Sequence, residues 1–312
     1  MGSSTLARLK AVARKSPLVW RYYRNLKPTL NYRFKLDLKP SSMEADRVLR
    51  DLNADGIAVT TVEALLGAEG QSLLQKVREE MATYDAQNAE GLDAARATAQ
   101  DPAAGDEKAF NFSYIVGKRT LTWNDDLLRF ALQTPILRLA NRYFGMLTRI
   151  RYCNVWRTFA TNAPARDSQL WHRDRDDHLT VKVFIYLEDV DEGAGPFQYA
   201  KGTHPKGEVR REPQGTPERP GGPLRTTDEE MAAVVPRDRW HLAVGKAGTI
   251  IFADTRGYHC GGRARERDRL MFIAMFVSSS TPPPAAGHID PDAAGVALPE
   301  DRERRFALTG QP

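Results

Sequence analysis

The chain has 312 residues, of which 41% are hydrophobic and 27% charged, so it holds enough apolar material for one large domain or two small ones. A mean hydropathy of -0.50 and the lack of any apolar run of about 18 residues exclude a protein embedded in a membrane. Two cysteines, Cys153 and Cys260, are too few for a disulfide framework, and Met1–Lys15 has no apolar secretion core. We therefore expect a reducing, cytoplasmic setting.

The positive charge is concentrated in an N-terminal extension, residues 1–40. This segment has ten Lys/Arg and one acid and carries +9, whereas the remaining 35 Lys/Arg and 39 Asp/Glu give -4. Its aromatic residues are Trp20, Tyr22, Tyr23, Tyr32 and Phe34. We expect the extension to pack against the acidic body or a sister subunit, and we expect no nucleic-acid partner. A membrane-surface role requires a sustained amphipathic helix, which Pro17 and Pro28 are expected to interrupt.

Residues 41–312 are interpreted as one folded domain whose first part is mainly helical. Ser41 and Glu44 fit a capping box at the first helix. The predicted elements are a helix to about Leu52, a short β-rich run at Gly56–Thr61, a helix over about Val62–Tyr84, a mobile loop over 85–108 and a helical pair over Asp125–Phe144.

After Gly145 the pattern changes to that of strands rich in Val, Ile, Phe, Tyr and Thr. The predicted strands are Thr148–Phe159, Leu179–Leu187, Phe197–Ala200, Gly248–Ala253 and Arg269–Ser278. Residues 205–238 contain six prolines and form a long insertion of the kind that makes a lid, and the tail after residue 281 is expected to be loosely attached. Helices followed by strands predict an α+β protein whose second half is a β-sandwich or barrel.

His172 and Asp174 form a His-x-Asp pair in the segment Trp171–Asp174. Alternate residues of an extended chain point to the same side, so His172 and Asp174 share a face. His259, after a later strand, can complete two histidines and one carboxylate, the facial triad of non-haem Fe(II) oxygenases. Arg269 begins an apolar strand, and its planar guanidinium suits a bidentate grip on a carboxylate.

Four segments carry a resemblance to a known family. They are Trp171–Asp174, Val183–Val190, Gly195–His204 and Gly245–Asp254. The third has the form Gly-Pro, an apolar run and Gly-Thr-His, and the fourth precedes the distal histidine. In this order and spacing, residues 41–280 resemble the phytanoyl-CoA dioxygenase-like family of Fe(II)/2-oxoglutarate-dependent oxygenases. The resemblance implies a double-stranded β-helix, a jelly-roll or cupin-like barrel flanked by N-terminal helices.

By this resemblance, His172, Asp174 and His259 bind Fe(II), and Arg269 binds the distal carboxylate of 2-oxoglutarate. Three protein ligands leave room for the cosubstrate and for O2.

Further cosubstrate contacts are expected on the neighbouring strands. Asn154, before the triad, and Lys182 and Phe184, after it, occupy positions where the family often contacts 2-oxoglutarate, although ordinary structural roles remain open for Lys182 and Phe184. Arg263 and Arg267 are alternatives to Arg269 for binding the carboxylate of 2-oxoglutarate, because they lie in the charged loop Gly261–Asp268 just before it.

The intact carboxylate at Asp174 favours hydroxylation, or desaturation or cyclisation, over halogenation. The implied reaction oxidises an unactivated C–H bond of a small organic substrate and releases succinate and CO2. Two other interpretations remain open: a catalytically inactive barrel acting as a binding module, and a Zn hydrolase, which would not need Arg269. The sequence does not specify the substrate, and a homo-oligomer through the N-terminal extension is a further hypothesis.

Overall fold

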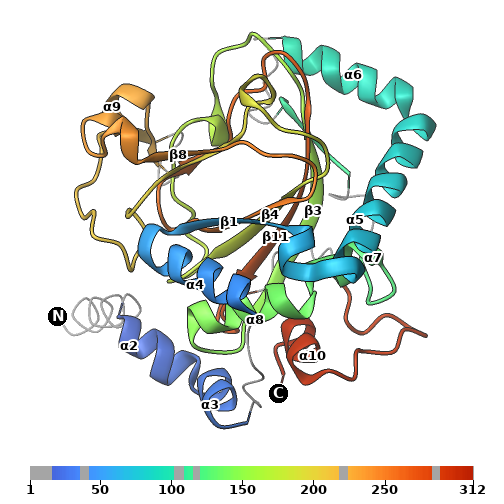
Figure 1. The fold of residues 1–312 in the computed structure, drawn as a ribbon, viewed down its shortest axis with the longest axis vertical. Coiled ribbons are helices and arrows are strands. Elements are labelled where there is room, and N and C mark those ends of the chain that lie inside the picture. The colour runs from blue at the N-terminus through green and yellow to red at the C-terminus, as the bar shows by residue number, and fades with distance from the viewer. Residues whose placement is uncertain are drawn as a thin grey trace, which may run out of the picture.

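The computed structural model of the protein describes residues 16–35, 42–101, 109–114, 120–217, 224–282 and 289–311. Helices and antiparallel sheets are combined in one structure, with the sheets at its centre and most helices on one side (Figure 1). This confirms the mixed composition expected from helices followed by strands. Within the described residues, none of the helices has the length and apolar character needed to span a bilayer.

Two antiparallel sheets form the centre. The larger has the order β1-β9-β4-β11-β3-β2 and the smaller the order β10-β5-β8. The strands of the larger sheet are β1 Ile57–Thr61, β2 Asn111–Ser113, β3 Arg149–Thr158, β4 Val181–Tyr186, β9 Thr249–Asp254 and β11 Arg269–Val277. Those of the smaller sheet are β5 Phe197–Ala200, β8 Trp240–Ala243 and β10 His259–Cys260, and a separate pair is β6 Thr216–Pro217 with β7 Leu224–Arg225. All five predicted strands are present.

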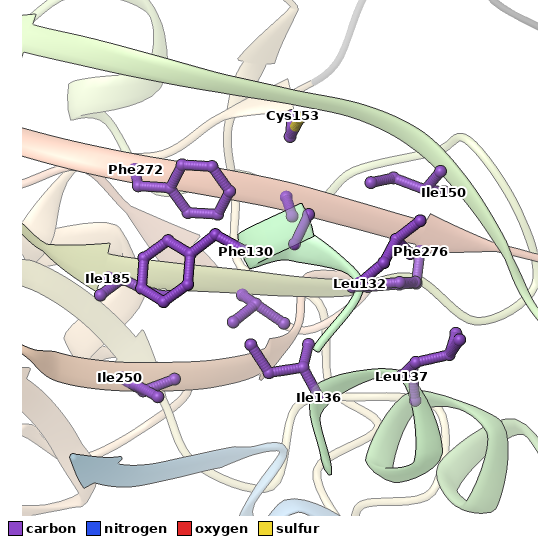
Figure 2. Packing of buried hydrophobic residues seen from close by; sticks show 14 of the residues in the cluster. Phe130, Leu132, Ile136, Leu137, Ile150, Cys153, Ile185, Ile250, Phe272 and Phe276 are labelled. Atoms are coloured by element: carbon purple, nitrogen blue, oxygen red, sulfur yellow. The ribbon is translucent and has the colours of Figure 1, made fainter. Parts of the chain in front are cut away.

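The outer face of the larger sheet packs against helices. These are α4 Met43–Asp55, α5 Val62–Gln87, α7 Asp126–Ala131, α8 Thr134–Phe144 and α10 Arg302–Thr309 (Figure 1). Strand alternation directs Ile185 of β4 and Phe272 of β11 to this side, where they share a cluster with Phe130 and Ile136 (Figure 2). Burying each such side chain contributes about 1.5–3 kcal/mol.

The inner face of the larger sheet lies against the smaller sheet. Phe184 and Tyr186 of β4 belong to the same buried cluster as Phe197 and Tyr199 of β5. Because strand residues alternate, every second residue of β3, β4 and β11 points into this space. The space between the sheets is therefore where inward-facing polar residues can meet.

The N-terminal extension docks onto this body over its described part. It consists of α2 Pro17–Val19, a π-helical turn Trp20–Arg24 and α3 Leu26–Lys35. Trp20 is buried, and its indole nitrogen donates to Asp177 (2.7 Å) and Ser278 (3.1 Å). The expected packing against the body is thus confirmed for residues 16–34, while residues 1–15 lie outside the described part.

The expectation that the two prolines interrupt a sustained helix is confirmed, because the helical stretch that begins at Pro17 ends at Arg24 and a second helix begins at Leu26. Pro17 occupies the first helical position of α2, and Pro28 is the third residue of α3. Proline is tolerated in a first turn because the amide hydrogen it lacks has no partner there. The segment therefore consists of two helical stretches, residues 17–24 and 26–35, which are separated at Asn25.

Three other local predictions are corrected. The mobile loop over 85–108 is wrong up to residue 100, because α6 Ala89–Gln100 is rich in the helix formers Ala, Leu and Arg; residues 102–108 lie outside the described part. The tail contains α10, which packs on α8 and β3 and buries Phe306 and Leu308. The first domain helix is capped by Ser42, whose hydroxyl accepts from Ala45, while Ser41 lies outside the described residues.

Candidate metal centre

His172, Asp174 and His259 come together on the inner face of the smaller sheet. One ligand atom from each lies within 4.8 Å of the others. The backbones of the two histidines pair reciprocally, with N–H to O distances of 2.9 and 3.0 Å, and their rings lie 4.3 Å apart. The amide of Asp174 donates to the carbonyl of Thr255 (2.8 Å), which fixes the third member.

Both imidazoles are in the state that a metal requires. The Nδ1 atom of His172 lies 2.8 Å from the Leu170 carbonyl, and that of His259 lies 3.0 Å from the Gly257 carbonyl. A carbonyl only accepts, so each Nδ1 carries the hydrogen and each Nε2 keeps a lone pair. Burial lowers the pKa of His259 to about 4 and holds the pKa of His172 well below its usual value. Both rings are neutral at pH 7 and fit a metal ligand.

Asp174 is ionised and contacts a buried lysine. Burial opposes ionisation, but the ammonium of Lys182, 2.7 Å from Asp174 Oδ2, holds the pKa of this carboxyl well below its usual range. The same oxygen lies 3.9 Å from His259 Nε2. One anionic oxygen and two neutral imidazoles are the donors that a divalent transition metal accepts.

Arg269 fits an anionic group that the protein itself does not supply. The side chain begins β11 and is 4% exposed. Its Nη2 donates to Thr158 Oγ1 (3.1 Å), but Nε and Nη1 have no hydrogen-bond partner among the described residues. A buried guanidinium with unsatisfied N–H donors suits an anionic oxygen group such as a carboxylate.

The rival arginines are engaged elsewhere. Arg263 donates to the Ala163 carbonyl (3.1 Å), and Arg267 is half-exposed and pairs with Asp191. Of the three arginines expected from the sequence to bind the carboxylate, only Arg269 is buried and has N–H donors without partners among the described residues.

Asn154 and Phe184 lie on the inner face but not at the metal set. Asn154 of β3 donates to Ser113 (2.7 Å), and its oxygen accepts from the amide of Val155 (2.8 Å). Phe184 stacks on Phe197 at 4.5 Å between ring centroids, and Phe197 lies 5.6 Å from the His259 ring. Phe184 thus forms an apolar wall behind the histidine.

Sequence reasoning missed Arg225 and Asp167. Thr226 pairs antiparallel with Trp171, so Arg225 lies across from His172 on the inner face. Its guanidinium forms a buried ion pair with Asp167, and its charge helps to lower the pKa of both histidines. Asp167, at φ 46°, has a left-handed backbone that non-glycine residues rarely adopt. No sequence pattern identifies Arg225, which lies in a Pro/Gly-rich insertion.

This insertion, residues 205–238, is attached to the strand that carries His172. The indole of Trp171 donates to Asp228 (2.6 Å), in the short helix α9 Asp228–Ala232. Met231 and Val235 are buried in a cluster with Trp171. A Thr227–Glu230 capping box starts this helix, which buries Met231.

Two neutral imidazoles and a carboxylate, buried between antiparallel sheets, are the donors of a mononuclear non-haem iron centre. The family described as phytanoyl-CoA dioxygenase matches residues 59–269, and the chain belongs to this family. The match contains the three residues of the metal set and ends at Arg269. No curated protein matches the sequence.

Several solved structures are similar. AviO1 from Streptomyces viridochromogenes Tue57 has 16% identity and a TM-score of 0.48 over 78% of this chain and 99% of its own. The epimerase SnoN, in complex with Fe3+, alpha ketoglutarate and nogalamycin RO, has 18% identity and a TM-score of 0.46 over 81% and 92%. EctD from S. alaskensis with bound Fe has 16% identity and a TM-score of 0.46 over 85% of this chain and 86% of its own. Similarity at this level carries no conclusion about the chemistry of this chain.

Proposed function

We propose that the protein is a non-haem Fe(II)/2-oxoglutarate-dependent dioxygenase that hydroxylates, desaturates or cyclises a small organic substrate at an unactivated C–H bond. The observation that carries the proposal is the buried set of two neutral imidazoles and one carboxylate in a member of this family. When bound, iron would activate O2, which is the oxidant, and 2-oxoglutarate would supply two of the electrons as it is converted to succinate and CO2.

In this proposal His172, Asp174 and His259 hold the metal. The carbonyls of Leu170 and Gly257 keep both imidazoles in the tautomer that presents Nε2 to it. The backbone pairing of the two histidines sets their spacing before any metal binds, so little reorganisation is needed.

Arg269 receives the distal carboxylate of 2-oxoglutarate through its N–H donors, and Thr158 orients the guanidinium. Asn154 and Phe184 border the cosubstrate from the inner faces of β3 and β4. A Zn hydrolase does not need a buried arginine that binds the carboxylate of a cosubstrate, so Arg269 favours the oxygenase over that alternative.

The fold proposed for residues 41–312 is a single double-stranded β-helix with flanking helices, preceded by the basic extension of residues 1–40. The insertion over 205–238 acts as a lid that excludes water from the metal. Its support is the pairing of Thr226 with Trp171, which adds the insertion to the edge of the smaller sheet next to His172.

The deciding experiment is anaerobic addition of Fe(II) and 2-oxoglutarate, followed by a screen for substrates that stimulate succinate formation. An oxygenase develops a visible absorption band from the iron and cosubstrate together. A protein that develops no band is an inactive barrel or a Zn enzyme, and zinc-dependent hydrolysis would separate these two.

A further inference from the structure

Lys182, expected from the sequence as a cosubstrate contact, is a buried cation beside the metal set. It lies on the inner face of β4 with its side chain 14% exposed, and its ammonium contacts Asp174 at 2.7 Å. Tyr152 of β3 shares this region: burial raises the pKa of its hydroxyl, and the charge of Lys182 and a hydrogen bond with Lys182 partly oppose that rise. A lysine is costly to bury unless it meets an anion.

Lys182 is remote from the distal-carboxylate receptor. In the ladder between β4 and β11, Lys182 lies opposite Met275, whereas Arg269 is six residues earlier on β11. Six residues of extended strand span about 20 Å. The two cations therefore mark opposite ends of the inner face, and only Arg269 is placed for the far end of the cosubstrate.

The charges of the inner face are unbalanced once the centre is complete. Among the described residues, Asp174 pairs with Lys182 and Asp167 pairs with Arg225. A metal bound here would share the Asp174 carboxylate with Lys182. The charge of Asp176 also acts on Lys182, but Asp176 pairs with Arg151, so Lys182 lacks a full counter-charge and a further anion near it is favourable.

Two unsatisfied hydroxyls flank the same position. Thr180 and Thr255 are fully buried, and neither Oγ1 has a hydrogen-bond partner among the described residues. Thr180 is two residues before Lys182 and so continues the same strand face, and its carbonyl accepts from the amide of Thr255 (2.9 Å). Buried hydroxyls without partners indicate a polar group supplied from outside the protein.

We propose that Lys182 is a specificity residue that anchors an anionic oxygen group of the substrate, a carboxylate or a phosphate, close to the carbon that is oxidised. This inference rests on the proposed function. Arg269 holds the cosubstrate at one end of the inner face, and Lys182, with the hydroxyls of Thr180 and Thr255, receives the substrate at the other.

The test uses the full chain with Fe(II) and 2-oxoglutarate in the absence of oxygen. The probes are carboxylic acids and monophosphates, each paired with its neutral methyl ester or alcohol, and binding is read from the absorption band and from the melting temperature. We expect the wild type to bind the charged member of one class roughly tenfold tighter or more. This preference should vanish in Lys182→Met, return in Lys182→Arg and persist in Lys246→Met, which removes an exposed lysine paired with Asp189.

Three results would overturn the inference: no preference for anions in the wild type, including no binding of any probe; a preference that survives in Lys182→Met; or a higher 2-oxoglutarate requirement in Lys182→Met, which would assign the lysine to the cosubstrate. A wild type that never develops the iron and 2-oxoglutarate band contradicts the proposed function itself and is seen before any probe is added.

A second, independent observation concerns the outer face of the N-terminal extension. Large apolar side chains are exposed there at every fourth residue, and the last three of them lie along one side of α3. They are Leu18 (69% exposed), Tyr22 (45%), Leu26 (42%), Leu30 (43%) and Phe34 (78%). Elsewhere in the described part of the chain, apart from the adjoining Tyr23, only Met43, Leu242 and Val244 are comparably exposed.

The charge of this extension indicates what covers the stripe. Arg24, Lys27 and Arg33 are exposed beside it, and no acidic residue occurs before Asp37. Two copies of this face would bring like charges together, which disfavours self-association through it. Cations beside exposed aromatic and leucine side chains are typical of helices that lie on anionic membranes.

We infer that this stripe binds the surface of an anionic membrane while Trp20, on the opposite side, keeps the extension docked. Full-length protein should sediment with vesicles of phosphatidylcholine and phosphatidylserine, less with phosphatidylcholine alone and less at high salt. Triple replacement of Leu26, Leu30 and Phe34 by Ser should abolish sedimentation, whereas Leu242→Ser with Val244→Ser should not. Failure to sediment, or a dimer in solution that the triple variant dissociates, would overturn the inference.

Discussion

Arg225 lies across the backbone ladder from His172, because Thr226 pairs with Trp171. An insertion of irregular sequence thereby places a cation beside the metal set and anchors it to Asp167. The position of the insertion and the electrostatics of the site are coupled through this one ion pair.

Arg225→Gln should loosen the insertion. Removing one partner of a buried ion pair costs about 3–5 kcal/mol, because the other charge stays buried. Limited proteolysis within residues 205–238 should be faster than in the wild type, and iron, 2-oxoglutarate and substrate together should slow it. Arg237→Gln, at an exposed pair with Glu229 in the same insertion, is the control. Equal cleavage of both variants would show that the insertion does not depend on this anchor.

His172→Ala and His259→Ala should each abolish retention of Fe(II) and turnover, because each removes one of three protein ligands. Metal content after gel filtration and circular dichroism measure binding and folding separately. His241→Ala, on β8 and outside the metal set, should retain iron. Full iron content in either ligand variant would remove that residue from the centre.

Arg269→Ala should raise the 2-oxoglutarate concentration needed for half-saturation. A charge-assisted contact contributes about 1.5–3 kcal/mol, or roughly 10- to 150-fold. Arg267→Ala, which removes a half-exposed side chain paired with Asp191, should change it little. If Arg267→Ala raised this concentration and Arg269→Ala did not, Arg267 would be the residue that binds the carboxylate.

Glu44 should contribute stability that depends on pH. Hydrogen bonds from Arg47 and Thr60 lower the pKa of Glu44 from 4.5 to about 2. A carboxyl with a lowered pKa stabilises the fold above its unfolded value, and this contribution is lost as pH falls from 4.5 to about 2. Glu44→Gln should therefore cost about 1–2 kcal/mol at pH 7, after allowance for partial exposure, and the cost should shrink below pH 4.5. Denaturant unfolding at pH 7 and pH 3 measures the difference.

Trp20→Ala should destabilise the whole domain, because a buried indole and two hydrogen bonds are lost. The expected cost is about 3–5 kcal/mol. Tyr23→Ala, at 83% exposure on the same extension, should stay within about 0.5 kcal/mol of the wild type. Thermal melting with size analysis checks both; equal melting temperatures would mean that the extension contributes nothing to folding.

The metal set was predictable because its geometry follows from local rules. His172 and Asp174 share a face by strand alternation, and the strands before His259 and around Arg269 have clear β-rich patterns. Arg225 was not predictable, since its place depends on one backbone pairing between distant segments. The burial of Trp20 is also a long-range property, because its partners Asp177 and Ser278 are far away in sequence.

The errors in the fold have physical reasons as well. The small and polar residues of the α6 segment predict a loop, because such residues are common in turns. Alanine, however, is also the strongest helix former. The composition of the tail predicts a loose segment because Pro and Ala precede α10, whose apolar residues, Phe306, Ala307 and Leu308, are too few and too close together to show a helical period. Short strands such as β2 and β10 have too few residues to show alternation.

The match to the family covers residues 59–269, but the hydrophobic core includes residues on both sides of this span. Trp20, Val48 and Leu52 before it, and Phe276 and Leu308 after it, are members of the same buried cluster. A fragment cut to the matched span would keep every proposed iron ligand and yet expose the apolar surface that these side chains cover. The segment that matches the family is thus shorter than the segment that forms the hydrophobic core. If the matched segment were grafted into another protein, that protein would have to cover the surfaces that α4, α10 and the Trp20 indole cover here.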